Sequence, residues 1–224
     1  MLLWADDYDE VPGRTYTRPY WPWDNFTTQN YHTNFKLSKS GEQLGLFQAS
    51  QSEIFTIIEE GSLWKYLDDG SDQGSAWIAI GFDDDNWGSG YAELGYGDDD
   101  EATVVEYGPD EDNKYITTYF RKVFTIDETE HIHEINARLL RDDGAIVYLN
   151  GIEIIRDNMP TGIISYNTQA RDAVSSSEEE MFHDWSVPVS LLNDGQNIIA
   201  VEIHQVDESS SDISFNLELK ATTY

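Results

Sequence analysis

The sequence predicts an all-β sandwich. From Phe55 onward, short apolar runs alternate with clusters of Gly, Asp, Asn and Ser, which is the spacing of short strands joined by turns. Helical periodicity is nearly absent. The chain has 224 residues, of which 39% are hydrophobic, so it is long and apolar enough to bury a core of its own.

The predicted strands follow one another along the chain. The first four lie at residues 64–67, 77–80, 103–107 and 115–121, and later ones at 132–140, 198–203 and 213–219. The last of these alternates strictly between apolar and polar residues, as a strand with one buried face does. Ser175 precedes a run of glutamates, and this order favours a short helical turn within residues 175–182.

A β-hairpin is predicted between these strands, with its turn at Asn150-Gly151. Asn-Gly between alternating apolar residues is the strongest short-range signal for a two-residue type I′ turn, because both central positions need positive φ. In this hairpin Ala145, Val147 and Leu149 share one face, and Ile146 and Tyr148 lie on the other.

Residues 1–54 are predicted to form a separate N-terminal part, an aromatic, Pro-rich arm followed by a hairpin, and residues 55–224 the sandwich. Residues 16–23 contain four aromatic side chains among prolines, which exclude a helix. The sequence leaves three arrangements of the arm open. The arm packs on its own sandwich, it exposes an aromatic patch, or it docks on a second copy to give a homo-oligomer through residues 1–34. The strand–turn–strand pattern at residues 34–47 resembles the closing hairpin of a bacterial lamin-tail domain.

Charge and composition exclude several classes of partner. The chain has 43 Asp and Glu against 13 Lys and Arg, a net charge of −30, which repels nucleic acid and anionic lipid surfaces. It contains no cysteine, so disulfides and thiolate metal sites are impossible. No apolar run reaches the roughly 20 residues of a membrane span. A saline, calcium-rich setting outside the cell suits such an acidic chain best.

Several segments together resemble one known family: residues 61–70, 81–87, 93–97, 116–121, the hairpin, and residues 200–205 and 210–215. The pattern is similar to that of the galactose-binding-domain-like accessory modules, which are carbohydrate-binding-module-like β-sandwiches of secreted bacterial multidomain proteins. The resemblance implies a jelly-roll β-sandwich, usually non-catalytic, that is secreted or held at the cell surface.

A ligand site is predicted around the hairpin and the end of a second strand. Its candidate residues are Arg141, Asp142, Asp143, Arg156, Asn158, Glu202, His204 and Gln205. Carboxylates, amides and a guanidinium can pair with vicinal hydroxyls or hold a cation, so the set suits a sugar or a cation. The alternative is a buried network in which the two arginines satisfy the carboxylates and strand-end carbonyls.

Calcium is the predicted cofactor, because acidic, glycine-containing loops supply the oxygen ligands that Ca²⁺ requires. The candidate ligands are Asp68, Asp69, Asp72, Asp83 and Asp85, although none of these loops has the full EF-hand spacing. Each loop could equally be a solvated turn. The acidic run at residues 98–101 is expected to be solvated.

The motifs of common enzymes are missing, among them Gly-x-Ser-x-Gly, His-Glu-x-x-His and the P-loop. The sequence therefore predicts a non-catalytic extracellular module that binds a polysaccharide or other glycan and contains structural calcium. The alternative is a structural or adhesive subunit of an extracellular filament or surface layer, joined through the N-terminal arm. A polysaccharide-degrading enzyme is the third hypothesis, since a glycosidase needs only a few placed carboxylates.

Overall fold

The computed structural model describes residues 3–5, 31–33 and 52–224, and its contacts divide the chain into two units, Met1–Ala49 and Ser50–Tyr224. In the first unit, β1 (Leu3–Ala5) pairs in parallel with β2 (Tyr31–Thr33). The predicted aromatic arm at residues 16–23 and hairpin at residues 34–47 lie outside the described residues. The predicted division after residue 54 falls within β3 (Glu53–Ile58) of the second unit.

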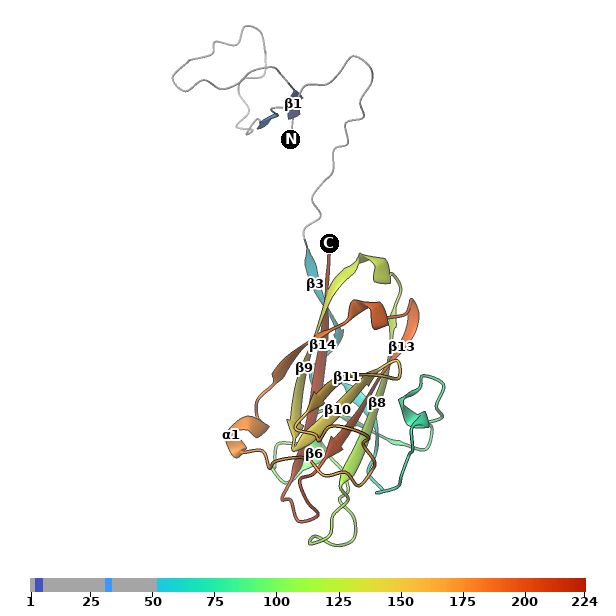
Figure 1. The fold of residues 1–224 in the computed structure, drawn as a ribbon, viewed down its shortest axis with the longest axis vertical. Coiled ribbons are helices and arrows are strands. Elements are labelled where there is room, and N and C mark those ends of the chain that lie inside the picture. Colours follow the sequence, from blue (N-terminus) through green and yellow to red (C-terminus); the bar gives the residue numbers. More distant parts are fainter. Residues whose placement is uncertain (1–2, 6–30, 34–51) are drawn as a thin grey trace. The chain divides into compact units, whose positions relative to one another are not determined.

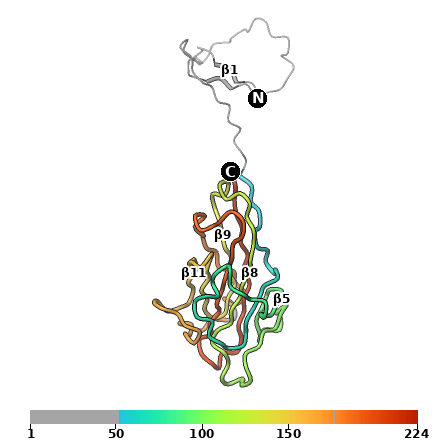
Figure 2. The backbone as a smooth tube through the Cα atoms, turned by 90° about the vertical axis from the view of Figure 1, so that its right-hand side faces the viewer, coloured from blue at the N-terminus to red at the C-terminus, as the bar shows by residue number. Residues whose placement is uncertain are grey.

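The second unit is a sandwich of two sheets (Figure 1). The first, here called the β10 sheet, has the strand order β11-β10-β13-β8-β4-β5. Its edge strands β11 and β5 lie on opposite sides of the molecule in Figure 2. The strands are β4 (Leu63–Leu67), β5 (Gly88–Tyr91), β8 (Thr117–Ile126), β10 (Gly144–Leu149), β11 (Ile152–Asp157) and β13 (Gly195–His204).

The second sheet, the β14 sheet, has the order β12-β9-β14-β6-β7. The long strand β14 pairs with β9 along one side, and with β6 and then β3 along the other. Its strands besides β3 are β6 (Leu94–Tyr96), β7 (Thr103–Val104), β9 (Ile132–Asp142), β12 (His183–Val187) and β14 (Ile213–Thr223). The predicted all-β sandwich is confirmed.

The core lies between the two sheets and follows from the alternation of the strands. Phe215 of β14 stacks on Phe120 of β8 at 4.3 Å between ring centroids, and meets Trp64 edge-on at 4.9 Å. All three rings are fully buried. Each such side chain contributes about 1.5–3 kcal/mol by leaving water, so this cluster joins the centres of the two sheets.

The hairpin of β10 and β11 forms as predicted. Asn150 and Gly151 have φ values of 52° and 83°, the positive φ that a type I′ turn requires. The two faces also match the prediction: Ala145, Val147 and Leu149 lie in the core, and Ile146 and Tyr148 lie on the outer face of the sheet. The β10 sheet therefore has a second apolar surface, turned away from the core.

Two predicted strands are wrong or shorter than expected. Residues 77–80 begin in a 3₁₀ helix, η1 (Ala76–Ile78), because Arg121 donates to the carbonyls of Trp77 and Ala79 and holds the segment as a turn. Residues 103–107 contain only the two-residue β7. Two further 3₁₀ turns are η2 (Thr129–His131) and η3 (Val189–Leu191).

Sequence patterning missed β5, β6 and β12, and it found the helical turn, α1 (Ser176–Glu179). The first two of these strands contain glycines that obscure the apolar pattern. Gly88 is required because a Cβ there would lie 2.5 Å from the Tyr66 ring, and Gly95 because a Cβ would collide with the carbonyl of Ile213. Within the described ranges, no helix has the length and apolar character needed to cross a membrane.

Candidate functional site

The outer face of the β10 sheet carries four polar or aromatic side chains on three neighbouring strands. Tyr148 of β10 lies opposite Glu153 of β11, and Ile146 lies between Arg156 of β11 and Glu202 of β13. Because residues paired across a sheet point to the same face, these side chains form one continuous surface. We call Tyr148, Glu153, Arg156 and Glu202 the outer-face cluster.

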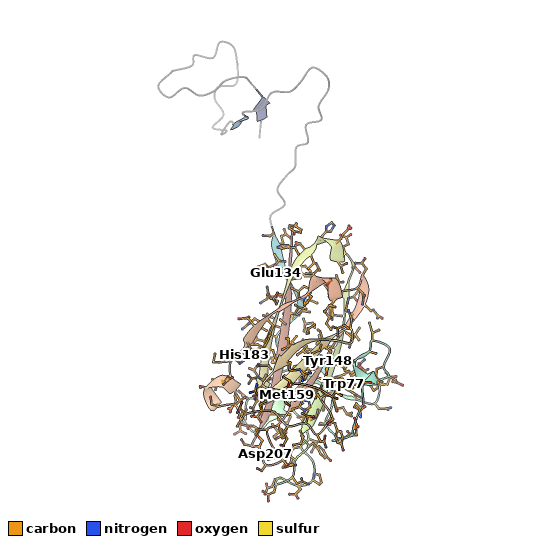
Figure 3. All side chains as sticks on the ribbon, in the orientation of Figure 1. Trp77, Glu134, Tyr148, Met159, His183 and Asp207 are labelled. Carbon is orange, nitrogen blue, oxygen red and sulfur yellow. The ribbon has the colours of Figure 1, made fainter. Side chains whose placement is uncertain are left out.

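Two chain segments border this cluster. On one side, the buried ring of Trp77 in η1 meets Tyr148 edge-on at 5.8 Å and Tyr119 at 4.8 Å. On the other, Met159 and Ala170 pack with Ile146. Figure 3 shows the labelled Trp77, Tyr148 and Met159 gathered over the middle of the sandwich. Tyr148 is half-buried between the two segments.

Arg121 fixes the η1 segment onto the sheet. Its side chain is 1% exposed, and Nε donates to Oδ2 of Asp84 at 2.7 Å. The guanidinium also lies 5.1 Å from the Phe82 ring centre. A buried arginine must be paired, and here an acid, two carbonyls and a ring satisfy it. The η1 segment with Trp77, which borders the outer-face cluster, is therefore fixed to the sheet.

Glu202 is oriented by Tyr148 and lies beside His204. Its Oε1 accepts the hydroxyl of Tyr148 at 2.8 Å, and its Oε2 lies 3.4 Å from Nε2 of His204. Glu202 is only 5% exposed and His204 is fully buried. Burial, and then the charge of Glu202, raise the pKa of Tyr148 above its usual value, so the phenol stays a neutral donor.

The tautomer of His204 follows from its hydrogen bonds. Nδ1 lies 2.7 Å from the carbonyl oxygen of Thr168, which can only accept, so we assign the proton to Nδ1. Thr117 supports this arrangement, because its hydroxyl is 2.8 Å from Nδ1 and donates to the carbonyl of Tyr166. His204 thus connects β13 to the segment that contains Thr168.

Arg156 forms a two-point ion pair with Glu153. Nε and Nη2 donate to the two carboxylate oxygens at 2.8 and 2.7 Å, while Nη1 donates to the carbonyl of Pro160 at 2.7 Å. Both charged side chains are partly open to solvent, at 23% and 37%. One N–H on each terminal nitrogen of Arg156 therefore remains for a ligand.

Three other predicted ligand residues connect loops to strand ends. The carboxylate of Asp143 accepts the backbone N–H of Val174 at 2.9 Å and of Val206 at 2.8 Å. Asn158 donates to the carbonyl of Asp143, and Gln205 to that of Tyr115. The structure thus brings the two predicted halves of the site to one end of the sandwich, where these residues form internal connections.

Arg141 and Asp142 complete the predicted set and face different surroundings. Arg141 donates from Nε to Asp157 at 2.7 Å and from Nη2 to Glu178 at 3.3 Å. Asp142 is 1% exposed, and its Oδ1 has no hydrogen-bond partner among the described residues. Burial, and then the neighbouring carboxylate of Asp143, raise the pKa of Asp142 to about 9.

The predicted calcium ligands cap turns in the structure. Asp69, Asp72 and Asp83 each accept the backbone N–H two residues further along, and Asp68 accepts that of Glu106 at 2.7 Å. Calcium binding by these loops and by Asp85 stays a prediction. Among the described residues, the acids gathered closely enough to share an ion are two other groups: Asp98, Glu179 and Asp212, and Asp98, Asp100 and Glu101.

Sequence reasoning did not find the outer-face cluster as a unit. The sequence predicts the face of Tyr148 and names Arg156 and Glu202 as ligand residues, but it does not indicate Glu153. The sequence carries no signal for this pair: Glu153 and Arg156 are three residues apart, so a regular strand would place them on opposite faces, and only the bulge in β11 returns both side chains to one face. For Asp98, Glu179 and Asp212 no local signal exists, because separate loops bring them together.

A cavity of about 620 Å³ lies at the opposite end of the strands. It is lined by the beginning of β9 and the ends of β8 and β14, and includes Phe55, His131 and Tyr224. The predicted ligand residues lie at the other end of β9 and β13. The cavity is therefore separate from the candidate site.

Comparison with known proteins gives a likeness of fold. No family model matches the sequence, and no curated protein does. The crystal structure of Bacteroides uniformis β-glucuronidase superposes with a TM-score of 0.51 and 18% identity, over 76% of this chain and 18% of that one. Bacteroides uniformis β-glucuronidase 2, covalently bound to cyclophellitol-6-carboxylate aziridine, gives 0.49 and 17%, over 76% and 18%.

The chain therefore spans less than a fifth of the length of these two solved proteins. At such low identity the likeness shows the β-sandwich fold alone.

Proposed function

We propose that this sandwich is a non-catalytic module that binds a neutral glycan on the outer face of the β10 sheet. The observation that carries the proposal is the outer-face cluster: Tyr148, Glu153, Arg156 and Glu202 lie side by side on three strands, between two covering segments. Binding sites for sugars combine an apolar ring with a few oriented polar groups. This surface offers both.

The chemistry of the cluster suits vicinal hydroxyls. The ring of Tyr148 supplies an apolar surface, and Arg156 keeps free N–H donors beside the acceptor oxygens of Glu153. A sugar hydroxyl both donates and accepts, so it can bridge these two side chains. Because Trp77 and Arg121 hold the neighbouring wall in place, little ordering entropy is lost on binding.

Charge favours a neutral glycan over an acidic one. The single positive side chain of the cluster, Arg156, is already neutralised by Glu153, and Glu202 adds a negative charge. The chain as a whole carries −30. A uronate would therefore approach a repulsive surface. The sandwich fold shared with a protein described as a β-glucuronidase supports a carbohydrate setting, in which this chain takes a different ligand.

The carboxylates of the cluster are engaged, which favours binding over hydrolysis. Glycoside hydrolysis needs one carboxyl group as acid and another as base or nucleophile on either side of the bond. Here Glu153 is held at both oxygens by Arg156, and Glu202 is held by Tyr148 and nearly buried. We therefore place the module among the accessory domains of a longer carbohydrate-active or adhesive protein.

Two further parts of the proposal concern setting and cofactor. The module works outside the cell or at its surface, where salt screens the 43 acidic side chains of the chain. Calcium is its cofactor, because a divalent ion at a carboxylate cluster removes local repulsion and stabilises the native state by mass action.

Affinity electrophoresis tests the glycan proposal. The protein is run through native gels containing galactan, mannan, β-glucan or polygalacturonate, and neutral polysaccharides are expected to retard it. Arg156→Ala and Glu153→Gln are expected to weaken retardation about tenfold, which corresponds to the loss of about 1.4 kcal/mol. Arg138→Ala is the matched control, since Arg138 also pairs with a glutamate, Glu218, on the other sheet.

Three results would overturn the proposal. Retardation by no neutral polysaccharide would remove the glycan, and an equal loss in the Arg138→Ala control would remove the surface. Release of reducing ends from any retarding polysaccharide would make the protein an enzyme.

A further inference from the structure

A second group of acidic side chains lies on the outer face of the β14 sheet, near the ends of β9 and β6. Asp98 follows β6, Glu179 ends α1 and Asp212 precedes β14. One carboxylate oxygen from each lies within 4.8 Å of the others. Figure 1 shows α1 and β6 at the same end of the sandwich. Three segments that are distant in sequence thus bring negative charges together.

Asp142 is a buried carboxylate on the same face of the sheet as this group. It pairs with Ser214 across β9 and β14, so the two side chains point to the same face of the sheet. Ser214 donates its hydroxyl to Oδ2 of Asp98 at 3.2 Å, which places Asp98 on that face as well. Asp142 is 1% exposed and its Oδ1 has no partner among the described residues.

A buried carboxylate oxygen without a partner costs free energy, which either a proton or a bound cation removes. The adjacent arginine does not supply a positive group, because Arg141 pairs with Asp157 and Glu178. Asp143 does not supply a positive group either, since it is itself a carboxylate whose two oxygens accept backbone N–H groups.

The loop after β6 and the loop before β14 approach each other closely because one position is a glycine. Gly97 has a φ of +114°, and a Cβ there would lie 2.6 Å from Cβ of Asp212. A side chain at this position would push Asp98 and Asp212 apart. The sequence therefore keeps two acidic loops in contact where electrostatics alone would separate them.

We propose that Asp98, Asp142, Glu179 and Asp212 bind one calcium ion that joins α1 and the two loops to the β14 sheet. Calcium fits better than magnesium, because Ca²⁺ takes six to eight oxygens in flexible geometry, whereas Mg²⁺ keeps most of its waters and uses only one or two carboxylates. Water completes the shell on the exposed side, at Asp98. This site deepens the calcium part of the proposed function and does not depend on the glycan part.

Isothermal titration calorimetry on the full chain, stripped of metal with EDTA, tests the site. CaCl₂ is expected to bind with one strong site per chain and to raise the melting temperature, while MgCl₂ at equal ionic strength does so far less. Asp142→Asn and Asp212→Asn are expected to weaken calcium binding at least tenfold. Asp98→Asn changes an exposed side chain, so it tests the site without disturbing folding if the Asp142 variant does not fold.

Asp110→Asn is the matched control, because Asp110 lies in another exposed acidic turn, where its Oδ1 accepts the backbone N–H of Asp112. It is expected to bind calcium as the unchanged chain does. Absence of calcium heat, or an equal loss in Asp110→Asn, would overturn the proposal. Calcium binding without glycan binding would leave this site standing and remove only the glycan proposal.

Discussion

The hydroxyl of Tyr148 donates to Oε1 of Glu202 at 2.8 Å, from one strand of the β10 sheet to the next. This bond joins the hairpin to β13 and fixes a carboxylate that is only 5% exposed. A nearly buried carboxylate oxygen that loses its hydrogen-bond donor stays desolvated without a partner, and this destabilises the folded state. The stability of the outer face should therefore depend on one hydroxyl group.

Tyr148→Phe removes that hydroxyl while keeping the ring. We expect the free energy of unfolding to fall by about 1–3 kcal/mol, because Oε1 of Glu202 is left without its partner. Urea denaturation measures the change. Tyr91→Phe, at a side chain that is 61% exposed, is the control and should be neutral. Equal stability of the two variants would contradict the role assigned to the Tyr148 hydroxyl.

Gly151→Val tests the turn of the hairpin. Gly151 has a φ of +83°, which a β-branched residue adopts only with strain, so we expect a loss of about 1–3 kcal/mol. Gly81→Val is the control, since Gly81 has open space around it and is not at positive φ. A neutral Gly151 variant would mean that the turn tolerates a side chain and does not set the register.

Arg121→Met tests the attachment of η1. Removing the guanidinium leaves Asp84 and the carbonyl of Trp77 without their donor, and we expect a loss on the order of 3 kcal/mol. Tryptophan emission should also shift to the red as Trp77 gains water. Arg171→Met, at an exposed arginine, should change neither signal. An unshifted spectrum in Arg121→Met would show that η1 stays in place without the arginine.

The unit Ser50–Tyr224 should fold without the N-terminal unit, because its core and both sheets lie within it. We expect a chain of residues 50–224 to unfold cooperatively in calorimetry. Light scattering on this chain and on the full chain tests the role of residues 1–34. A full chain that is multimeric while residues 50–224 are monomeric would favour the structural or adhesive subunit over the glycan-binding module.

Local patterns were sufficient to predict the parts of the fold that depend on neighbours in sequence. The hairpin followed from Asn150-Gly151 and from alternation in β10, and the long strand β14 from its strict apolar period. The strand expected at residues 77–80 does not form, because Arg121, 44 positions from Trp77, donates to the carbonyl of Trp77. In a strand this carbonyl would accept a hydrogen bond from a neighbouring strand. A contact between residues so far apart in sequence does not change the local pattern of apolar residues, so that pattern does not predict it.

The same reason limits prediction of the sites. The sequence predicts Arg141, Asp143 and Asn158 near the hairpin, but whether they face a ligand or the backbone depends on two loops, those of Val174 and Val206. The acidic run at residues 98–101 was expected to be solvated. Its first residue meets Asp212 through Gly97, a proximity that only the folded chain reveals.

Binding of a neutral glycan by the outer face of the β10 sheet is tested most directly by an NMR titration of ¹⁵N-labelled protein. The titrant is an oligosaccharide of whichever neutral polysaccharide retards the protein most. We expect the largest amide shifts to fall on Tyr148, Glu153, Arg156 and Glu202 and on the residues beside them in the sheet. Shifts confined to the outer face of the β14 sheet, around Arg138 and Lys220, or no shifts at millimolar sugar, would contradict it.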